Sequence, residues 1–278
     1  MAFIKREEAL KRLRKTVDSG QPIVGCGAGT GISAKFAERG GADLIIIYNS
    51  GRYRMAGRGS LAGLMPYGDA NGIVVDMASE VLPVVQDTPV LAGVCGTDPF
   101  RLMPVFIKQL KEMGFSGVQN FPTVGLMDGD FRANLEATGM GYDKEIEAVA
   151  IAHGLDMLTT PYVFDPDQAR AMVAAGADVL VAHVGLTTAG SIGAAVAFTL
   201  DEAIDKVMAI AEAGKSLRPD VLVICHGGPF DEPENVGTAL ARMAGVAGFF
   251  GASSIERLPT ERAITQQVQD FKNLPMAA

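Results

Sequence analysis

The chain has 278 residues, with 24 lysines and arginines against 32 aspartates and glutamates, so its formal net charge is −8. Hydrophobic residues make up 48% and charged residues 20%, the mix of a folded globular protein rather than a disordered, collagen-like or coiled-coil chain. The acidic balance argues against a nucleic-acid-binding surface, which is normally basic. Because the sequence contains no run of roughly 18 apolar residues, we expect no membrane-spanning helix.

The chain begins with a charged segment of helical pattern that lacks the features of a secretion signal. We expect an amphipathic helix within residues 1–20 that either closes one end of the fold or packs on a partner subunit. Cys26, Cys95 and Cys225 are too few and too scattered for a disulfide framework. They predict reduced thiols and a cytoplasmic location.

Eight short apolar segments follow, separated by segments with helical periodicity. Most are continuously apolar, as in LIIIY and VLVAHV, which is typical of parallel strands buried on both faces. They span residues 22–28, 43–49, 89–95, 117–121, 156–162, 178–184, 220–226 and 247–252. A long loop is expected after the second segment, over residues 49–69.

Helices are predicted between these strands by apolar residues at helical spacing. The stretch 103–113 is one example, and Gly114 is placed to end it. Gly214 is placed in the same way after a later helix. Asp98-Pro99 and Asp165-Pro166 each put a carboxylate before a proline, which is the pattern of a helix start.

Eight strands that alternate with helices predict an α/β fold, a (β/α)₈ TIM barrel with an extra N-terminal helix, as a single domain over residues 1–278. A doubly wound open sheet is the alternative, but no linker or change of composition divides the chain. Gly-Ala-Asp precedes the second and the sixth strand, at 41–43 and 176–178, as a duplicated half-barrel would arrange it. The glycines of segment 25–31 lack dinucleotide-binding spacing, so no nucleotide cofactor is expected.

Two histidines are the strongest candidates for catalysis. Active sites of TIM barrels lie at the carboxyl ends of the strands, and His183 and His226 end two predicted strands. Histidine exchanges protons near neutral pH, so we assign both as candidate catalytic residues, with hydrogen-bonded core positions as the alternative. Asp98 is the acid nearest to a strand end and is a third candidate, unless it only caps the following helix.

Groups suited to an anion are predicted in the same region. Guanidinium groups bind carboxylate and phosphate, and glycine-rich loops after the last two strands are common phosphate sites in barrels. We therefore expect a small anionic substrate with phosphate or phosphonate and a carboxylate. The candidate binding residues are Asn49, Arg52, Arg54, Asn120, Gly227, Gly228, Ser253 and Ser254.

Some reaction classes are disfavoured by what the strand ends lack. No lysine ends a predicted strand, which argues against Schiff-base chemistry. No two strand ends carry carboxylates, which argues against a glycosidase pair. No spacing of acids identifies metal ligands, so the sequence leaves a metal site unknown.

Five segments of the chain carry a resemblance to a known protein family. They are GCGAGTGISAKFAERGGADLIIIYNSGRYRMAGRGSLAGLMPYGDAN, VLAGVCGTDPF, GVQNFPTVGLMDG, TTPYVF and VAHVGLTTAGSIGA. The chain from Ile23 to about Leu258 resembles the phosphoenolpyruvate hydrolase-like TIM-barrel family, whose domain also occurs behind an ATP-binding domain in Tm-1-like proteins. The resemblance implies a barrel of the phosphoenolpyruvate/pyruvate superfamily. It also implies hydrolysis of phosphonopyruvate or phosphoenolpyruvate to pyruvate and phosphate.

The resemblance implies further features and leaves alternatives. Superfamily members use a divalent metal such as Mg²⁺, held by strand-end acids, and an acid-Asp-Lys run in a gating loop, which this chain lacks. A homo-oligomer is expected. A non-catalytic ligand-sensing or signal-transduction barrel is one alternative function, and a carbon–carbon lyase of the same superfamily is another.

Overall fold

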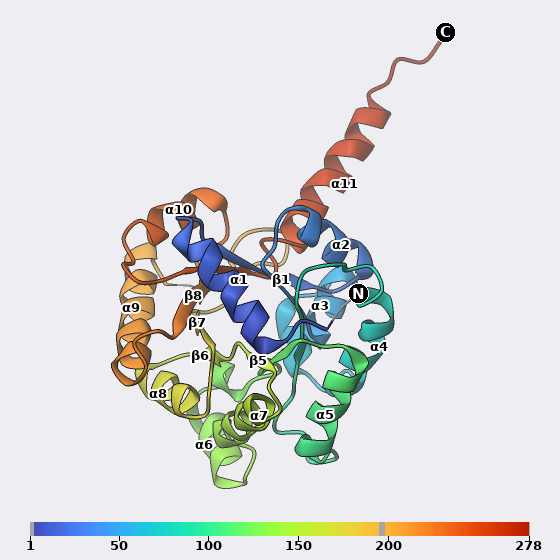
Figure 1. Ribbon diagram of the computed structural model, residues 1–278. Coiled ribbons are helices and arrows are strands. Elements are labelled where there is room, and N and C mark those ends of the chain that lie inside the picture. Colours follow the sequence, from blue (N-terminus) through green and yellow to red (C-terminus); the bar gives the residue numbers. More distant parts are fainter. Residues whose placement is uncertain (1–2, 195–197, 278) are drawn as a thin grey trace.

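The computed structural model describes residues 3–194 and 198–277 (Figure 1). Its strands are all parallel and form one sheet with the hydrogen-bonded order β5-β4-β3-β2-β1-β9-β8-β7-β6. The strands are β1 (Ile23–Ala28), β2 (Leu44–Ile47), β3 (Val90–Gly93), β4 (Gly117–Gln119), β5 (Leu158–Thr159), β6 (Tyr162–Val163), β7 (Val179–His183), β8 (Leu222–His226) and β9 (Gly248–Gly251).

Helices surround this sheet, as Figure 1 shows for the view along its axis. Two short 3-10 helices, η1 (Ser60–Leu64) and η2 (Val124–Leu126), lie in loops. The α-helices are α1 (Arg6–Asp18), α2 (Gly31–Arg39), α3 (Asn49–Met55), α4 (Ala70–Val81), α5 (Met103–Met113), α6 (Gly129–Ala137), α7 (Tyr142–Gly154), α8 (Pro166–Ala174), α9 (Leu200–Leu217), α10 (Pro233–Leu240) and α11 (Arg257–Lys272). None of the helices within the described residues is both long and apolar enough to cross a membrane.

The sheet closes into a barrel because β5 and β6 are two halves of one interrupted strand. Only Thr160 and Pro161 separate them. On one side the amide of Thr160 donates to Val118 of β4, and on the other the amide of Val181 of β7 donates to Pro161. The predicted eight-stranded (β/α)₈ barrel is therefore confirmed, with its fifth strand divided by a proline, which cannot donate to a sheet ladder.

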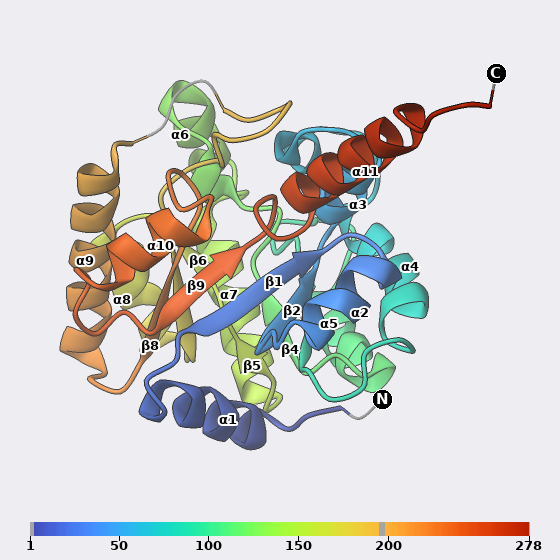
Figure 2. The same cartoon turned by 90° about the horizontal axis from the view of Figure 1, so that it is seen from above.

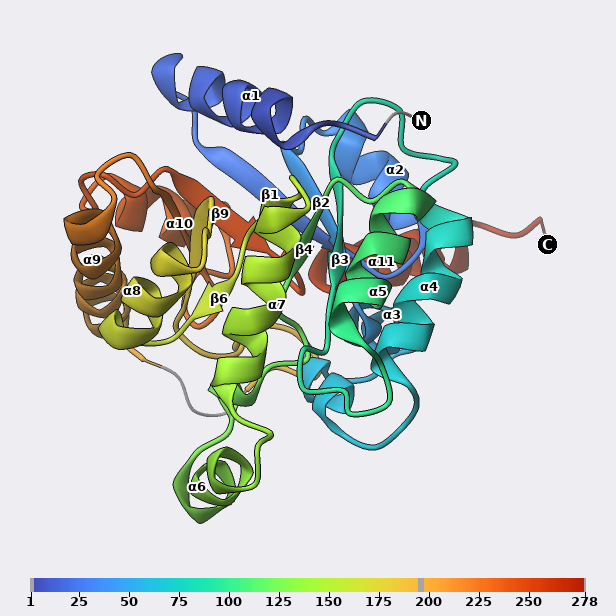
Figure 3. The same ribbon diagram turned by 60° about the horizontal axis from the view of Figure 1, so that its bottom comes forward.

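The N-terminal helix α1 covers the amino-terminal end of the barrel, which is one of the two positions that its pattern allows. Figures 2 and 3 show α1 across one end of the strands and α6 beyond the other. Arg6 forms an ion pair of 2.7 Å with Asp178, and Thr16 donates to Asp43 at 2.8 Å. These two aspartates end the two Gly-Ala-Asp repeats, so both repeats attach the same helix to the start of a strand.

Several helix boundaries differ from the predicted ones. Asp165 caps α8 as expected, with its carboxylate accepting from the amide of Gln168. Gly114 ends α5 in the left-handed conformation, with φ 108°. The prediction for Asp98-Pro99 was wrong, because α5 begins only at Met103; the carboxylate of Asp98 is instead held by other side chains. The prediction for Gly214 was also wrong, since α9 continues to Leu217.

The glycines of β1 make room for side chains inside the barrel. A Cβ atom added at Gly25 would lie 2.7 Å from the ring of Phe250, and one at Gly27 would lie 3.0 Å from the hydroxyl of Tyr48. The small residues of β1 therefore allow large side chains from β9 and from the end of β2 to fill the barrel interior.

Candidate active site at the carboxyl end of the barrel

A small polar cavity lies at the carboxyl ends of the strands, and we call it the histidine cavity. Its volume is about 30 Å³. The imidazoles of His183 and His226 line it, and it also contains the predicted binding residues Arg54 and Ser253. The other lining residues are Tyr48, Ser50, Ser60, Leu61, Phe121, Leu126, Tyr162, Gly185, Leu186, Thr187 and Ala252.

The ring of Tyr162 stands among the aromatic rings of this cavity. Its centroid lies 4.9 Å from that of His183 and 5.0 Å from that of His226. The two imidazole centroids are 4.7 Å apart. Both histidines end neighbouring strands in register, so the parallel ladder places their side chains on the same side of the barrel wall.

Backbone contacts fix a different tautomer for each histidine. The amide of Gly185 donates to Nδ1 of His183 at 3.0 Å, so a neutral His183 carries its hydrogen on Nε2. Nδ1 of His226 lies 2.7 Å from the carbonyl oxygen of Phe250, which can only accept, so that nitrogen carries the hydrogen. His226 Nε2 is then an acceptor, 3.4 Å from the hydroxyl of Tyr162.

Burial keeps both imidazoles neutral. Desolvation holds the pKa of His183 well below its usual value, and electrostatic repulsion from Lys206 and from a protonated His226 acts in the same direction. Desolvation lowers the pKa of His226 to about 4, although its hydrogen bond to Phe250 acts in the opposite direction. At neutral pH the cavity thus presents one imidazole N–H donor and one imidazole acceptor.

Arg54 supplies a buried positive charge beside the two histidines. Only 2% of the residue is exposed, and its guanidinium donates to Ser50 and to Glu256, each at 3.1 Å. Burial disfavours its charge, but Tyr48 and Glu256 hold the pKa of Arg54 above its ordinary value. Its Nε atom is buried without a hydrogen-bond partner. A small anion could accept this hydrogen bond.

Glu256 holds the loops around Arg54 in place. Besides Arg54, its carboxylate accepts from the amide of Gly29 and from the hydroxyl of Ser33 at 2.6 Å. Since these contacts join the segments after β1, β2 and β9, they fix Arg54 relative to the barrel.

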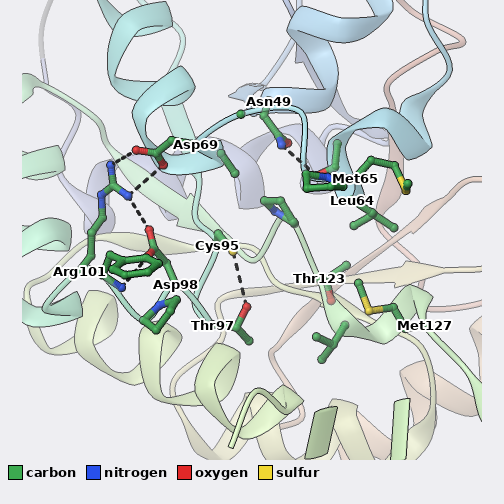
Figure 4. Close-up of a pocket in the computed structure, with 18 residues that line it drawn as sticks. Asn49, Leu64, Met65, Asp69, Cys95, Thr97, Asp98, Arg101, Thr123 and Met127 are labelled. Atoms are coloured by element: carbon green, nitrogen blue, oxygen red, sulfur yellow. Dashed lines mark hydrogen bonds and ion pairs between the residues drawn. The ribbon is translucent and has the colours of Figure 1, made fainter. Parts of the chain in front are cut away.

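A larger cavity of about 690 Å³ adjoins the same end of the barrel (Figure 4), and we call it the outer cavity. Two predicted site residues, Asn49 and Asp98, line it together with Asp69, Cys95, Thr97 and Arg101. The amide of Asn49 donates to Gly63 at 2.9 Å, and its Oδ1 atom is buried without a partner. Apolar side chains such as Leu64, Met65 and Met127 form the rest of its wall.

Arg101 occupies the acidic side of the outer cavity. It lies between Asp69 and Asp98, with ion pairs of 2.6 and 2.5 Å, as Figure 4 shows. Asp98 also accepts from the side chain of Asn71 at 2.9 Å and from the amide of Phe100. Burial opposes ionisation of Asp98, but these donors hold its pKa below the usual value.

Asn120 lies under the mouth of the barrel among fully buried polar groups. It exchanges hydrogen bonds with the backbone of Tyr162 and donates to Glu145 at 2.6 Å. Glu145 also accepts from the amide of Val124 at 2.8 Å. Burial raises the pKa of Glu145 to about 7. In the structure Asn120 thus connects β4 to β6 and α7.

The remaining predicted binding residues lie at different distances from the cavities. Arg52 pairs with Glu80 at 2.8 Å and is partly exposed, away from the two histidines. Gly227 and Gly228 adopt positive φ angles of 82° and 55°. The amide of Gly228 donates to the carbonyl of Gly185, so these glycines join the loops after β7 and β8 beside the histidine cavity. Ser254 follows Ser253 in the chain but does not line the histidine cavity.

Several residues of this region are not among the predicted site residues. Tyr48 and Tyr162 end apolar segments, and that position could have indicated them. The expected loop over 49–69 contains α3 and η1, and helix α3 is what turns Arg54 inward. Glu256 lies three residues after Ser253, within reach of the predicted site, but its partner Arg54 is 202 positions away. No local pattern reveals such a pairing.

A divalent metal does not fit the donors present at this end of the barrel. Mg²⁺ prefers carboxylate and other hard oxygen ligands. Within the described ranges 3–194 and 198–277, no group of three or more histidine, cysteine, aspartate or glutamate side chains is arranged to hold a metal ion. The nearby carboxylates of Asp69, Asp98 and Glu256 already bind arginines.

The closed parallel barrel with polar groups at the carboxyl ends of its strands defines this chain as a TIM-barrel protein of the α/β class. A sequence model described as phosphoenolpyruvate hydrolase-like matches residues 8–274, and the chain belongs to this family.

Two curated relatives come from tomato, Solanum lycopersicum. The ToMV resistance protein Tm-1(GCR237) and the ToMV susceptible protein tm-1(GCR26) are each 61% identical to this chain over 272 residues. The match covers 98% of this chain and 36% of each relative, so the chain spans about a third of their length.

Two solved structures illustrate the likeness of fold. A phosphonopyruvate hydrolase in complex with oxalate and Mg²⁺ has a TM-score of 0.59 at 17% identity, covering 99% of this chain and 93% of that one. An oxaloacetate acetylhydrolase has a TM-score of 0.62 at 17% identity, covering 95% and 87%. At this identity the likeness shows the fold.

Proposed function

We propose that this protein is a hydrolase or lyase for a small phospho- or phosphono-carboxylate, with phosphonopyruvate or phosphoenolpyruvate as its substrate. The observation that carries the proposal is the histidine cavity, where an N–H donor on His183 and an acceptor on His226 lie beside the buried guanidinium of Arg54. Membership of the phosphoenolpyruvate hydrolase-like family supports the substrate class.

The groups of the cavity suit the hydrolysis of phosphonopyruvate. Water adds to phosphorus, the carbon–phosphorus bond breaks, and its electron pair remains on the pyruvate enolate, which then takes a proton on carbon. In this scheme Nε2 of His226 accepts the proton of water, and the imidazolium of His226 returns that proton to the enolate carbon, while Nε2–H of His183 donates a hydrogen bond to the developing enolate. Arg54 stabilises the enolate oxygen. The sum is one water consumed, with phosphate and pyruvate as products.

Substrate access requires a change at the outer side of the histidine cavity. Its volume of about 30 Å³ is far below the roughly 300–1,000 Å³ of typical ligand sites. A neighbouring cavity of about 150 Å³ shares Ser60, Leu61, Leu186, Thr187 and Ser253 with it. Displacement of Leu61 and Leu186 would join the two spaces, and we propose this as the route for substrate.

Asp98, the third catalytic candidate, lies in the outer cavity in an ion pair with Arg101. We assign Asp98 and Asn49 to the wall next to the catalytic groups rather than to proton transfer. No step of the proposed reaction passes through a metal, because the residues present do not fit one.

The test is release of phosphate and pyruvate from phosphonopyruvate and from phosphoenolpyruvate, measured separately. We expect His226→Ala to lower kcat by roughly 10²–10⁴-fold, the usual contribution of general acid–base catalysis, and His183→Ala to lower it by roughly 10²–10³-fold, the usual effect of removing one donor to a developing oxyanion. His153→Ala, which changes the remaining histidine on α7, is the matched control and should retain activity. Absence of turnover with both substrates in the wild-type protein would overturn the proposal.

A ligand-sensing barrel without turnover is the second candidate. It is favoured by the carboxylates of this region, all of which are held by arginines or backbone amides. Binding of phosphonopyruvate with no product formed would identify this function. A carbon–carbon lyase would use the same two histidines, and product analysis with oxaloacetate as substrate distinguishes it.

We also propose that the protein forms a homo-oligomer through α11. This helix extends away from the barrel (Figures 1 and 2), and its apolar residues Ile264, Val268 and Phe271 are exposed. A cavity of about 680 Å³ lies between its first turns and α2, where Phe36 is exposed as well. Burial of both apolar surfaces against a second copy of the chain would remove them from water.

We also propose that the protein resides in a reducing, cytoplasmic environment. Cys26, Cys95 and Cys225 are all free thiols. Burial raises the pKa of Cys26 and Cys225 to about 12, so these two behave as small apolar core residues.

A further inference from the structure

We infer that the histidine cavity binds its anion through Arg54 and without a divalent metal ion, an inference that rests on the proposed function. It concerns how negative charge is neutralised at this site. A buried guanidinium and a bound cation are two solutions to the same electrostatic requirement. The distribution of carboxylates around the barrel mouth decides between them.

The carboxylates of the outer cavity have no oxygen left for a cation. Both oxygens of Asp69 accept from Arg101, and one also accepts from the amide of Gly72. Asp98 accepts from Arg101 and Asn71 on one oxygen and from the amide of Phe100 on the other. A metal ion here would have to displace a positively charged side chain.

The two buried glutamates of this region, Glu145 and Glu256, also accept hydrogen bonds on both carboxylate oxygens. Glu145 accepts from Val124 and Asn120 with its two oxygens, and burial favours its neutral form. Glu256 divides its oxygens between Arg54 and the donors of the loop after β1. These carboxylates therefore act as acceptors within the protein.

The strand ends themselves carry weak ligands for Mg²⁺. β2 is followed by Asn49, which is neutral, and β3 by Cys95, whose pKa burial raises so that it remains a thiol. Nδ1 of each histidine is used by the backbone, at Gly185 for His183 and at Phe250 for His226. Nε2 of His226 is the remaining imidazole acceptor, faces the hydroxyl of Tyr162 at 3.4 Å, and is insufficient by itself to hold an ion.

Arg54 offers a positive charge for an anionic ligand, which the strand-end groups do not. It is a permanent cation in a water-poor site, where an electrostatic contact is stronger than at the surface. Its Nε–H has no partner, while Ser50 and Glu256 hold the rest of the guanidinium. A planar carboxylate that accepts from Nε–H of Arg54 and from Nε2–H of His183 would satisfy two donors at once. The ligand class is thus a small acid with a planar carboxylate.

The experiment is calorimetric titration of the full chain with oxalate, a planar dicarboxylate probe. One sample is dialysed against EDTA, and the other contains excess MgCl₂. We expect the two dissociation constants to agree within about twofold. Oxalate binding that is lost in EDTA and restored by MgCl₂ would overturn the inference, as would the absence of oxalate binding in both samples.

Substitution of Arg54 tests the residue itself. Arg54→Lys keeps a cation next to Glu256 but removes the Nε donor, so we expect the affinity for oxalate to fall at least tenfold. Arg170→Lys, on the exposed surface of α8, is the matched control. If Arg54→Lys does not fold, the neutral double variant Arg54→Gln, Glu256→Gln replaces it, with the same loss expected. Unchanged affinity in a folded variant would refute the role of Arg54.

The outcome is separable from that of the proposed function. Metal-independent oxalate binding together with no turnover of phosphonopyruvate or phosphoenolpyruvate would sustain this inference and overturn the catalytic proposal. Turnover that depends on added Mg²⁺, with oxalate bound only in its presence, would overturn this inference and the metal-free reaction scheme but would sustain the proposed substrate class.

Discussion

His183 and His226 pair directly in the register between β7 and β8, and their imidazole centroids lie 4.7 Å apart. Two protonated rings at this separation would repel each other strongly, because both are buried away from bulk water. The folded protein therefore favours neutral histidines, so its free energy of unfolding depends on pH.

The first prediction concerns acid unfolding. The pKa of His226 is about 4 in the folded protein, against 6.5 as the reference value. Below pH 6.5 the unfolded chain binds the proton more readily, so this contribution to stability is complete above pH 6.5 and is lost as the pH falls towards 4. The loss amounts to about 3 kcal/mol.

The variant His226→Asn removes this titration while its amide can still donate to Phe250. Urea unfolding at several pH values should show the wild type more stable than the variant at pH 7.5. The difference should shrink by about 3 kcal/mol on going to pH 4. A difference that stays constant with pH would contradict the assignment.

The second prediction concerns the attachment of α1. Asp178 is 4% exposed, and it accepts from Arg6 and from the amide and hydroxyl of Thr159. Asp178→Ala leaves the amide of Thr159 and the partly exposed guanidinium of Arg6 without this acceptor, while the hydroxyl of Thr159 still donates to Gly176, so we expect a loss of about 1–3 kcal/mol in the free energy of unfolding. Asp220→Ala, which removes the exposed ion pair with Arg14, should cost less than about 1 kcal/mol. Equal effects would show that α1 does not depend on the buried pair.

The third prediction concerns a glycine behind the histidine cavity. A Cβ atom at Gly93 would lie 2.3 Å from Cβ of Tyr48 and 3.1 Å from the carbonyl oxygen of Phe121. Gly93→Ala should therefore destabilise the protein by about 1–3 kcal/mol and shift Tyr48 within the cavity. Gly59→Ala meets no atom within 4 Å, and Gly59 has a φ of −68°, so thermal unfolding of this control should match or exceed the wild type.

The fourth prediction concerns α11. If its apolar face packs on a second copy, Val268→Glu and Phe271→Glu should convert the oligomer to a monomer, because a charge opposes burial of that face. Light scattering after size-exclusion chromatography measures the mass directly. Gln266→Glu adds the same charge on the opposite side of the helix and should leave the mass unchanged. A monomeric wild-type protein at micromolar concentration would overturn the oligomer proposal.

Much of the barrel could be predicted because its strands are buried on both faces. Continuous apolar runs such as 43–49 and 178–184 contain the observed strands β2 and β7. The same reasoning placed His183 and His226 together, since the ends of neighbouring parallel strands meet at one edge. The interruption at Thr160 and Pro161 was missed, because 156–162 was interpreted as one strand although its proline cannot donate a ladder hydrogen bond.

The candidate site was less predictable. Arg52 and Arg54 carry the same charge in the same segment, and sequence treated them alike. The segment forms α3, and residues two positions apart on a helix point about 200° away from each other. Arg54 therefore enters the barrel mouth and binds Glu256, while Arg52 binds Glu80 on the outside.

The order of apolar and polar residues along the chain determined the class of fold, the end of the barrel that carries polar groups and the two histidines found there. These features follow from local periodicity and from the rule that parallel strands share a direction. The tertiary structure alone decided which arginine is buried, which nitrogen of each imidazole carries the hydrogen and which carboxylates are already paired. The amide of Gly185 that fixes the tautomer of His183 is only two residues away, but Phe250 lies 24 positions from His226 and Glu256 lies 202 positions from Arg54. The free energy of a buried charge such as that of Arg54 is set by such distant partners rather than by its sequence neighbours.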